Sequence, residues 1–75
     1  MGSDSDFIPN CEVKENGLLV CQPKQITKNG TIGSREPMKF HLDKYSGRIT
    51  VISTGGASEE LVSKTLRHLE RNFRR

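Results

Sequence analysis

The sequence predicts an α+β fold, a small antiparallel β-meander of three to five strands with one C-terminal amphipathic helix packed on one face. Three observations lead to this prediction. Apolar residues recur at helical spacing in residues 58–75, strand-compatible runs fill most of the preceding chain, and two Asn-Gly pairs mark tight turns between such runs. Because short connections place consecutive strands side by side, the strands form a meander over which the helix folds back.

The composition indicates one small domain with a thin core. The chain has 75 residues, of which 32% are hydrophobic. Domains of this size lie near the lower limit for folding alone, so stabilisation by a partner, including homodimerisation, is compatible with the sequence. Residues 1–6 are predicted to be a disordered N-terminal segment that begins with an added leader, and residues 7–75 to be a single domain of a larger protein.

The first two strands are predicted on either side of Asn16-Gly17. This pair favours a two-residue type I′ turn, in which both residues need positive φ. Residues 11–15 and 18–22 then form the paired strands. In the register that such a turn sets, Cys11 and Cys21 point to opposite faces of the hairpin, so a disulfide between them is disfavoured.

The chain then reaches a second Asn-Gly turn. Pro23 has no backbone N–H, so it limits the end of the preceding strand to a sheet edge or a bulge. Residues 24–28 are a short strand candidate, and Asn29-Gly30 is a turn of the same type. We expect residues 31–32 to pair back and residues 33–37 to form a polar loop.

A clear hairpin is predicted over residues 38–54. Residues 38–43 alternate between two faces. The apolar face carries Met38, Phe40 and Leu42, and the polar face carries Lys39, His41 and Asp43. Residues 44–47 form the turn. The strand over residues 48–54 is rich in β-branched residues and partly apolar on both faces, which is typical of a central strand.

One stretch of this hairpin has a local resemblance. Phe40–Val51, with its aspartate, Ser-Gly and following isoleucine, resembles the strand–turn–strand phrase of cadherin repeats. The calcium-binding motifs of that family are not found in the sequence, and an amphipathic C-terminal helix is not part of its sandwich. The resemblance therefore implies a hairpin, and no site is carried over from it.

The amphipathic helix is predicted over residues 58–75. Ser58 follows two glycines and is a good N-cap, and Glu59 and Glu60 in the first turn suit the helix dipole. A helix of this length is marginal alone in water, so its apolar stripe must be covered by the sheet. The predicted core consists of Val13, Val20, Met38, Phe40, Leu42, Ile49, Val51, Leu61, Val62, Leu66, Leu69 and Phe73.

No arrangement of residues in the sequence indicates catalysis. The only thiols and imidazoles belong to Cys11, Cys21, His41 and His68. These residue types could form a Cys–His pair or a zinc site. Their spacing lacks the close ligand pairs of zinc fingers and ribbons, and both histidines are predicted on polar faces. We therefore expect a protein that is not an enzyme and that holds no metal or cofactor.

The charge distribution supports an alternative function. The net charge is +3, and basic residues decorate the predicted helix and the hairpin before it: Lys64, Arg67, Arg71, Arg74, Arg75, Lys39 and Arg48. Such a surface can follow a phosphate backbone or meet an acidic protein. Three glutamates on the same helix and the lack of an aromatic cluster for base stacking weigh against nucleic acid. A nucleic-acid-binding domain is therefore the alternative interpretation.

The first interpretation is a non-enzymatic module that mediates protein–protein interaction. A small sheet with one helix leaves one sheet face open, and the predicted outer face carries His41, Thr50 and Ile52. We expect another protein as the partner and no membrane association, because no apolar stretch approaches transmembrane length. The expected location is intracellular, in the cytoplasm or the nucleus.

Overall fold

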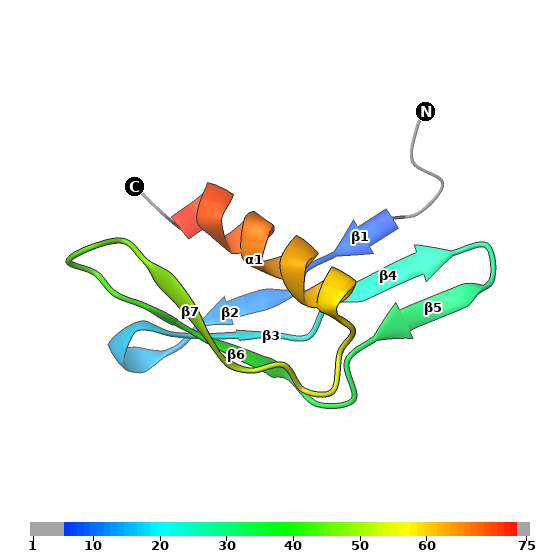
Figure 1. Ribbon diagram of the computed structural model, residues 1–75, viewed down its shortest axis with the longest axis horizontal. Coiled ribbons are helices and arrows are strands. Elements are labelled where there is room, and N and C mark those ends of the chain that lie inside the picture. The colour runs from blue at the N-terminus through cyan, green and yellow to red at the C-terminus, as the bar shows by residue number, and fades with distance from the viewer. Residues whose placement is uncertain (1–5, 74–75) are drawn as a thin grey trace.

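The computed structural model describes residues 6–73, which form two antiparallel sheets and one α-helix at the C-terminal end (Figure 1). The strands are β1 (Asp6–Ile8), β2 (Cys11–Val13), β3 (Leu18–Cys21), β4 (Lys24–Thr27), β5 (Gly30–Gly33), β6 (Met38–Leu42) and β7 (Ile49–Ser53), and the helix is α1 (Glu59–Phe73). The predicted α+β fold is confirmed, with more strands than expected. β1 begins at Asp6, the last residue of the predicted disordered segment, whose other residues lie outside the described range.

The two sheets are the two halves of one bent meander. Their strand orders are β1-β4-β5 and β2-β3-β6-β7. The β1–β4 and β2–β3 pairs share a single register, which runs from Ile8 opposite Lys24 to Cys11 opposite Cys21. Extending this register places Pro9 opposite Pro23, next to Asn10, whose φ is +48°. The left-handed backbone at Asn10 and the fixed φ of the two prolines interrupt the regular strands there, and each long strand is divided into two short ones.

The turn between β2 and β3 differs from the predicted one. It contains three residues, Glu15–Gly17, and the Lys14 N–H donates to the Leu18 carbonyl oxygen across it at 2.7 Å. Gly17 has a φ of +79°, and a Cβ at this position would lie 2.6 Å from the Leu42 carbonyl oxygen. The three-residue loop is another common hairpin connection, and it shifts the pairing by one residue from the expected register.

The shifted register overturns the prediction about the cysteines. Cys11 lies opposite Cys21, with Cα atoms 4.0 Å apart, and the two form a disulfide. The Gln22 N–H donates to the Asn10 carbonyl oxygen at 3.1 Å, so the neighbouring rung is hydrogen-bonded and the cysteine pair is a non-hydrogen-bonded one. Side chains in such pairs approach each other closely, which explains why the cross-link forms here.

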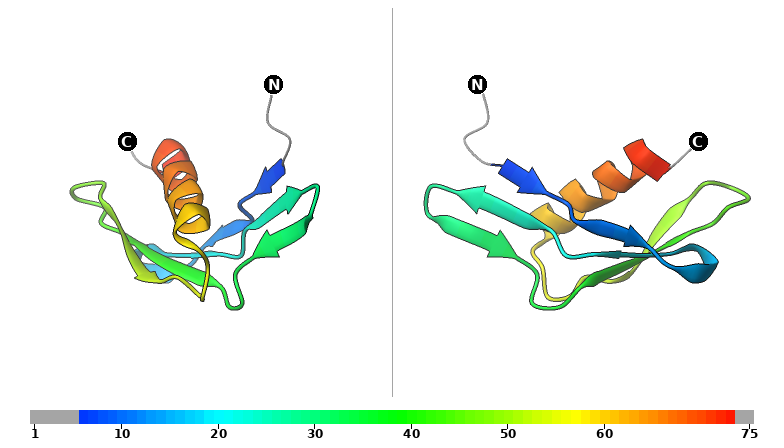
Figure 2. Two further views of the ribbon diagram at one scale, coloured as in Figure 1. Left: turned by 45° about the vertical axis from the view of Figure 1, so that its right-hand side comes forward. Right: turned by 180° about the vertical axis from the view of Figure 1, so that it is seen from behind.

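The helix lies on one side of the bent sheet, between its two halves (Figure 2). We call the sheet face that α1 covers the concave face and the opposite one the convex face. The Ser58 hydroxyl accepts a hydrogen bond from the Leu61 N–H at 3.3 Å, as expected of an N-cap. Leu61, Thr65 and Leu69, at intervals of one helical turn, are buried against the sheet. The predicted helix is therefore confirmed, and so is its packing on one face.

The connection before the helix is fixed by Gly55. Its carbonyl oxygen accepts hydrogen bonds from the N–H groups of Arg35 and Glu36, at 2.9 and 3.1 Å. Gly55 has a φ of +63°, and a Cβ there would collide with the Glu36 carbonyl oxygen. Only glycine fits this backbone and this close approach. The loop between β5 and β6 is thereby attached to the segment that leads into α1.

The core is confirmed in part. Met38, Phe40, Ile49, Leu61 and Leu69 are buried as predicted, whereas Val20, Leu42, Val62, Leu66 and Phe73 are only partly buried. Val13 and Val51 are 61% and 41% exposed, so their assignment to the core is wrong. The register shift explains part of this difference, because it places Leu19 and Cys21 on the concave face and Val20 on the convex one. Pro23, Gln25 and Thr65 complete the buried set.

The strand over residues 48–54 was predicted to be central, and this prediction is wrong. β7 pairs with β6 on one side only and forms an edge of its sheet. The chain turns away after Ser53 into the connection that leads to α1, so no later strand covers the other side of β7. β7 is therefore an edge strand with the composition of a central one.

Reduction of the disulfide is expected to destabilise the fold. The Cys11–Cys21 bond joins residues 10 positions apart, and the chain-entropy model predicts a loss of about 2–4 kcal/mol in the free energy of unfolding when the bond is broken. Urea denaturation with and without reductant measures the effect. A variant with both cysteines replaced by alanine is the control, since reductant must not change its curve. Coincident curves for the oxidised and reduced wild-type chain would contradict the prediction.

Truncation of the helix at its buried stripe should have a large effect. Leu69 is 0% exposed, and Leu69→Ala is expected to lower the free energy of unfolding by about 2–5 kcal/mol through lost burial and the remaining cavity. Ile32→Ala removes the same number of carbons from a side chain that is 50% exposed, and should cost about 1 kcal/mol or less. Equal losses in chemical denaturation would show that α1 is not packed as described.

Candidate functional site

The convex face of the β2-β3-β6-β7 sheet is left open by the helix. Along this face, His41 of β6 pairs with Leu18 of β3 on one side and Thr50 of β7 on the other. The Thr50 hydroxyl donates to the His41 carbonyl oxygen at 3.4 Å. Ile52, which the register shift in the β6–β7 pairing leaves without an opposite residue, is 57% exposed further along β7. The structure therefore places the predicted sheet-face residues His41 and Thr50 side by side on this face, with Ile52 exposed beyond them on the same strand.

Two further apolar residues on this face were missed by sequence reasoning. Leu18 and Val20 of β3 are half-buried on the convex face, and β6 lies between them and the exposed Ile52 of β7. Glu12 and Lys14 lie along the β2 edge of this face and form an ion pair at 3.0 Å, and Lys39 of β6 lies opposite Val20. The surface that these residues form, which we call the convex patch, is a mixture of apolar and charged rows. Interfaces between separately folded proteins have such a mixed character.

The second surface is a groove between α1 and β1. Lys64, Arg67, His68 and Arg71 line it on the helix side, and Phe7 lines it on the strand side. We call it the basic groove. The Lys64 ammonium donates to the Gln25 side-chain oxygen at 2.9 Å, which ties the helix to β4. Arg67 and Arg71 are exposed. The groove therefore presents a row of cationic side chains along one flank of the helix.

The remaining basic candidates lie elsewhere. Lys39 is on the convex face, on the other side of the sheet from α1. Arg48 follows the β6–β7 turn and lies near Glu70, at the far end of the helix. Arg74 and Arg75 lie outside the described residues. The predicted basic surface is thus divided, and the structure brings together only Lys64, Arg67 and Arg71 of the residues that sequence reasoning assigned to it.

The turn that carries Arg48 is held by Asp43. Its carboxylate accepts a hydrogen bond from the Tyr45 N–H at 2.9 Å, and the Gly47 N–H donates to the Asp43 carbonyl oxygen at 2.7 Å. The hydrogen bond from Tyr45 is the largest cause that holds the pKa of Asp43 below its ordinary value. Asp43 therefore shapes the turn as a carboxylate, and the exposed Tyr45 projects from it.

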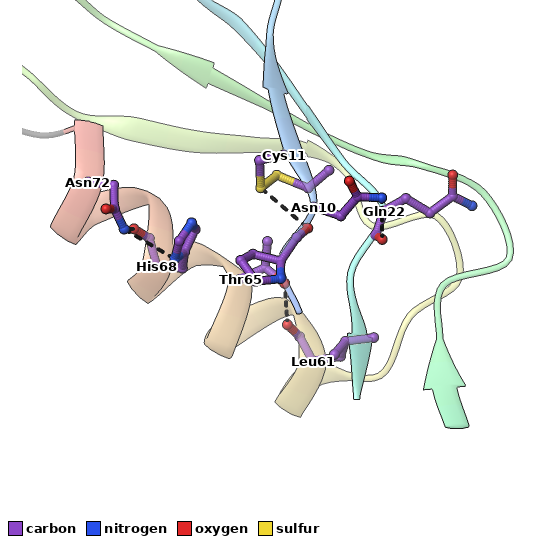
Figure 3. Close-up of a disulfide and its surroundings, with 9 residues drawn as sticks. Asn10, Cys11, Gln22, Leu61, Thr65, His68 and Asn72 are labelled. Atoms are coloured by element: carbon purple, nitrogen blue, oxygen red, sulfur yellow. Dashed lines mark hydrogen bonds between the residues drawn. A yellow bond between two sulfur atoms is a disulfide. The ribbon is translucent and has the colours of Figure 1, made fainter. Parts of the chain in front are cut away.

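The cysteines and histidines do not form a common site. Cys11 and Cys21 are bonded to each other beneath α1, close to the side of the helix that carries Thr65 and Leu61 (Figure 3). His41 is on the convex face, and His68 is on the helix, where the Asn72 amide donates to its carbonyl oxygen at 2.7 Å. Within residues 6–73, no group of three or more His, Cys, Asp or Glu side chains gathers in a way that could hold a metal ion.

Comparisons with known proteins do not place the chain in a family. No family model matches it, and neither the curated proteins nor the solved structures give a match. Among the described residues, no helix is long and apolar enough to cross a membrane. The functional argument therefore depends on the surfaces alone.

Proposed function

We propose that this chain is a non-enzymatic protein-binding module, and that the convex patch is where its partner binds. The observation that carries the proposal is the exposure of Ile52, which is 57% accessible on the edge strand of an open sheet face. Leu18 and Val20 on β3 add apolar area, and Lys39 and His41 on β6 lie between them and Ile52. A partner surface that covers this patch would gain hydrophobic burial at the apolar residues and polar contacts at Lys39 and His41.

The helix contributes indirectly to this function. By covering the concave face, α1 supports the strands from behind, so the convex face is presented on a rigid sheet rather than on a loop. Interfaces between rigid surfaces lose less conformational freedom on binding than flexible ones do. The proposal includes a place within a larger protein and an intracellular location, in the cytoplasm or the nucleus, which imaging of the tagged protein in its source cells tests.

A pair of matched variants tests the convex patch. Ile52→Glu introduces a charge at the most exposed apolar residue of the patch, and Ile32→Glu introduces the same charge at a residue of β5 that is 50% exposed and belongs to the other sheet. Proteins that the wild type and Ile32→Glu retain from source-cell extract are expected to be retained at least tenfold less by Ile52→Glu. Circular dichroism confirms that both variants are folded. Equal retention by the two variants would contradict the assignment of the patch.

The second candidate function is nucleic-acid binding, and the basic groove is the observation that favours it. Arg67→Glu combined with Arg71→Glu should abolish binding of a mixed-sequence single-stranded RNA. Binding by the wild type should weaken as salt rises, with a slope of about −0.7 per phosphate contact on a logarithmic plot. Lys39→Glu combined with Arg48→Glu changes the net charge equally, but outside the groove, and should bind as the wild type does. Salt-insensitive binding, or no binding at low salt, would exclude this function.

A further inference from the structure

The open edge of β7 offers backbone groups for pairing. The Asp43 N–H donates to the Arg48 carbonyl oxygen at 2.8 Å, which marks a hydrogen-bonded rung at the start of the β6–β7 ladder. Hydrogen-bonded and non-hydrogen-bonded pairs alternate along an antiparallel ladder. Thr50, two residues after Arg48, therefore directs its N–H and C=O towards β6. Ile49 and Val51 direct theirs away from β6, towards the open side.

The other free edges of the described sheets carry features that discourage pairing. The β1–β2 edge is interrupted by Pro9 and by Asn10, whose φ is +48°, and it carries the charged Asp6 and Glu12. β5 begins and ends with a glycine. Prolines, charges and irregular backbone are the usual protection of edge strands.

The β7 edge lacks most of this protection. Its residues include neither a charge nor a proline, and a register shift opposite Lys39 and Phe40 affects only its C-terminal end. Val51 and Ile52 are 41% and 57% exposed. A flat, apolar and unprotected edge strand is a template for pairing with another chain. The edge that the fold leaves unprotected is therefore also the most apolar one.

The composition of β7 fits a strand with neighbours on both sides. Apolar residues lie on both of its faces, as in a central strand, yet within one copy it is an edge. We infer that β7 pairs antiparallel with β7 of a second copy of this chain, about a two-fold axis at Thr50. The two copies then share one continuous sheet in which β7 is central.

This register matches the exposed groups. Ile49 lies opposite the second copy's Val51, and both residues have outward backbone groups, so each such pair exchanges its hydrogen bonds. Thr50 lies opposite its own counterpart, and Thr–Thr pairs are favourable across strands. Arg48 lies opposite the second copy's Ile52. No charged residue meets a like charge in this pairing, although each copy has a net charge of +3.

The size of the surface favours a second copy over a short peptide. A standard interface takes about 800 Å² from each partner, which is about one seventh of the 5487 Å² of accessible surface here. The strand edge alone covers less than this area. Val62, Leu66 and Phe73 are half-buried on the side of α1 opposite the basic groove, and α1 makes its closest backbone approach to β7. The two-fold axis therefore brings the apolar flanks of both α1 helices towards the β7–β7 junction, where they add to the buried area.

The test is the mass of the chain in solution. Light scattering over a concentration series from micromolar to millimolar is expected to show twice the 8.4 kDa of one copy. Thr50→Lys places like charges opposite each other at the two-fold axis. This variant should have a mass of 8.4 kDa at every concentration. It should remain folded, because Thr50 is exposed. Thr31→Lys, at an exposed residue of the β5 edge, is the matched control and should remain dimeric.

A cross-link tests the register directly. Thr50→Cys is expected to form a disulfide-linked dimer under mild oxidation, because non-hydrogen-bonded pairs bring their side chains close together. Thr31→Cys should not do so. Wild-type chain that is monomeric throughout the series, or a Thr50→Lys variant that is still dimeric, would overturn the proposal. A third outcome would also overturn the dimer proposal: a monomer whose β7 amides become protected from hydrogen exchange only when another protein is added. That result would assign the β7 edge to the other protein.

The dimer is independent of the proposed function, and the variants separate the two. Ile52→Glu would place a carboxylate opposite the second copy's Arg48, so the dimer should survive the change that abolishes partner binding at the convex patch. Thr50→Lys should abolish the dimer and leave Leu18, Val20 and Ile52, the apolar residues of the convex patch, unchanged. Loss of both properties in Ile52→Glu would indicate that the two surfaces are not separate.

Discussion

The burial of one face of α1 against the concave side of the sheet is the interaction on which the rest of the structure depends. A 15-residue helix is marginal alone, and within residues 6–73 the strands have no other partner layer. Leu61 and Leu69 are almost fully buried, and each contributes about 1.5–3 kcal/mol through its burial. Together they supply a large share of the roughly 5–15 kcal/mol by which folded domains are stable. Thr65 is tolerated between them because its hydroxyl donates to the Leu61 carbonyl oxygen at 2.8 Å.

The shape of the sheet follows from the irregular backbone at Asn10 and the two prolines that face each other beside it. A flat meander would not curve around a single helix, and this irregular stretch allows the long hairpin to bend there. The same bend gives the sheet one face that the helix can cover and another that it cannot. The disulfide lies just beyond the bend on the concave side, where it holds β2 to β3 under the helix. The open convex patch is therefore a consequence of how the concave face is closed.

Sequence periodicity was sufficient for the helix and for β6, because each has one clear apolar face. It was not sufficient for the β2–β3 register, since Asn16-Gly17 is compatible with loops of two or three residues and Leu18, Leu19 and Val20 are all apolar. The alternation that normally sets a register is absent there. The disulfide and the burial of Leu19 both depend on that one-residue difference, so neither could be derived from local patterns.

The candidate surfaces show a related limit. Alternation along β6 placed Lys39 and His41 on the face opposite Phe40, and the structure agrees. Lys39 and Arg48 do not share a surface with the basic residues of the helix, because the helix covers the face of the sheet opposite Lys39 and Arg48 lies near its far end. Proximity in sequence to a basic helix does not place a side chain on its surface. The sheet face that a helix covers has to be known before charged residues of a neighbouring hairpin are assigned to the same surface as the helix.

The three surfaces can act together, because the convex patch and the β7 edge, which share Ile52, use different groups: the patch offers side chains and the edge offers backbone N–H and C=O groups. The convex patch faces away from α1, the basic groove lies between α1 and β1, and the β7 edge is at the opposite side of the sheet from β1. The proposed pairing at β7 would join the convex faces of two copies into one surface, which presents the patch twice. A partner with two binding sites would then be bound more tightly than either site binds alone, through effective concentration rather than through new contacts. On this proposal, a thin-cored domain would gain both stability and binding strength from the same edge.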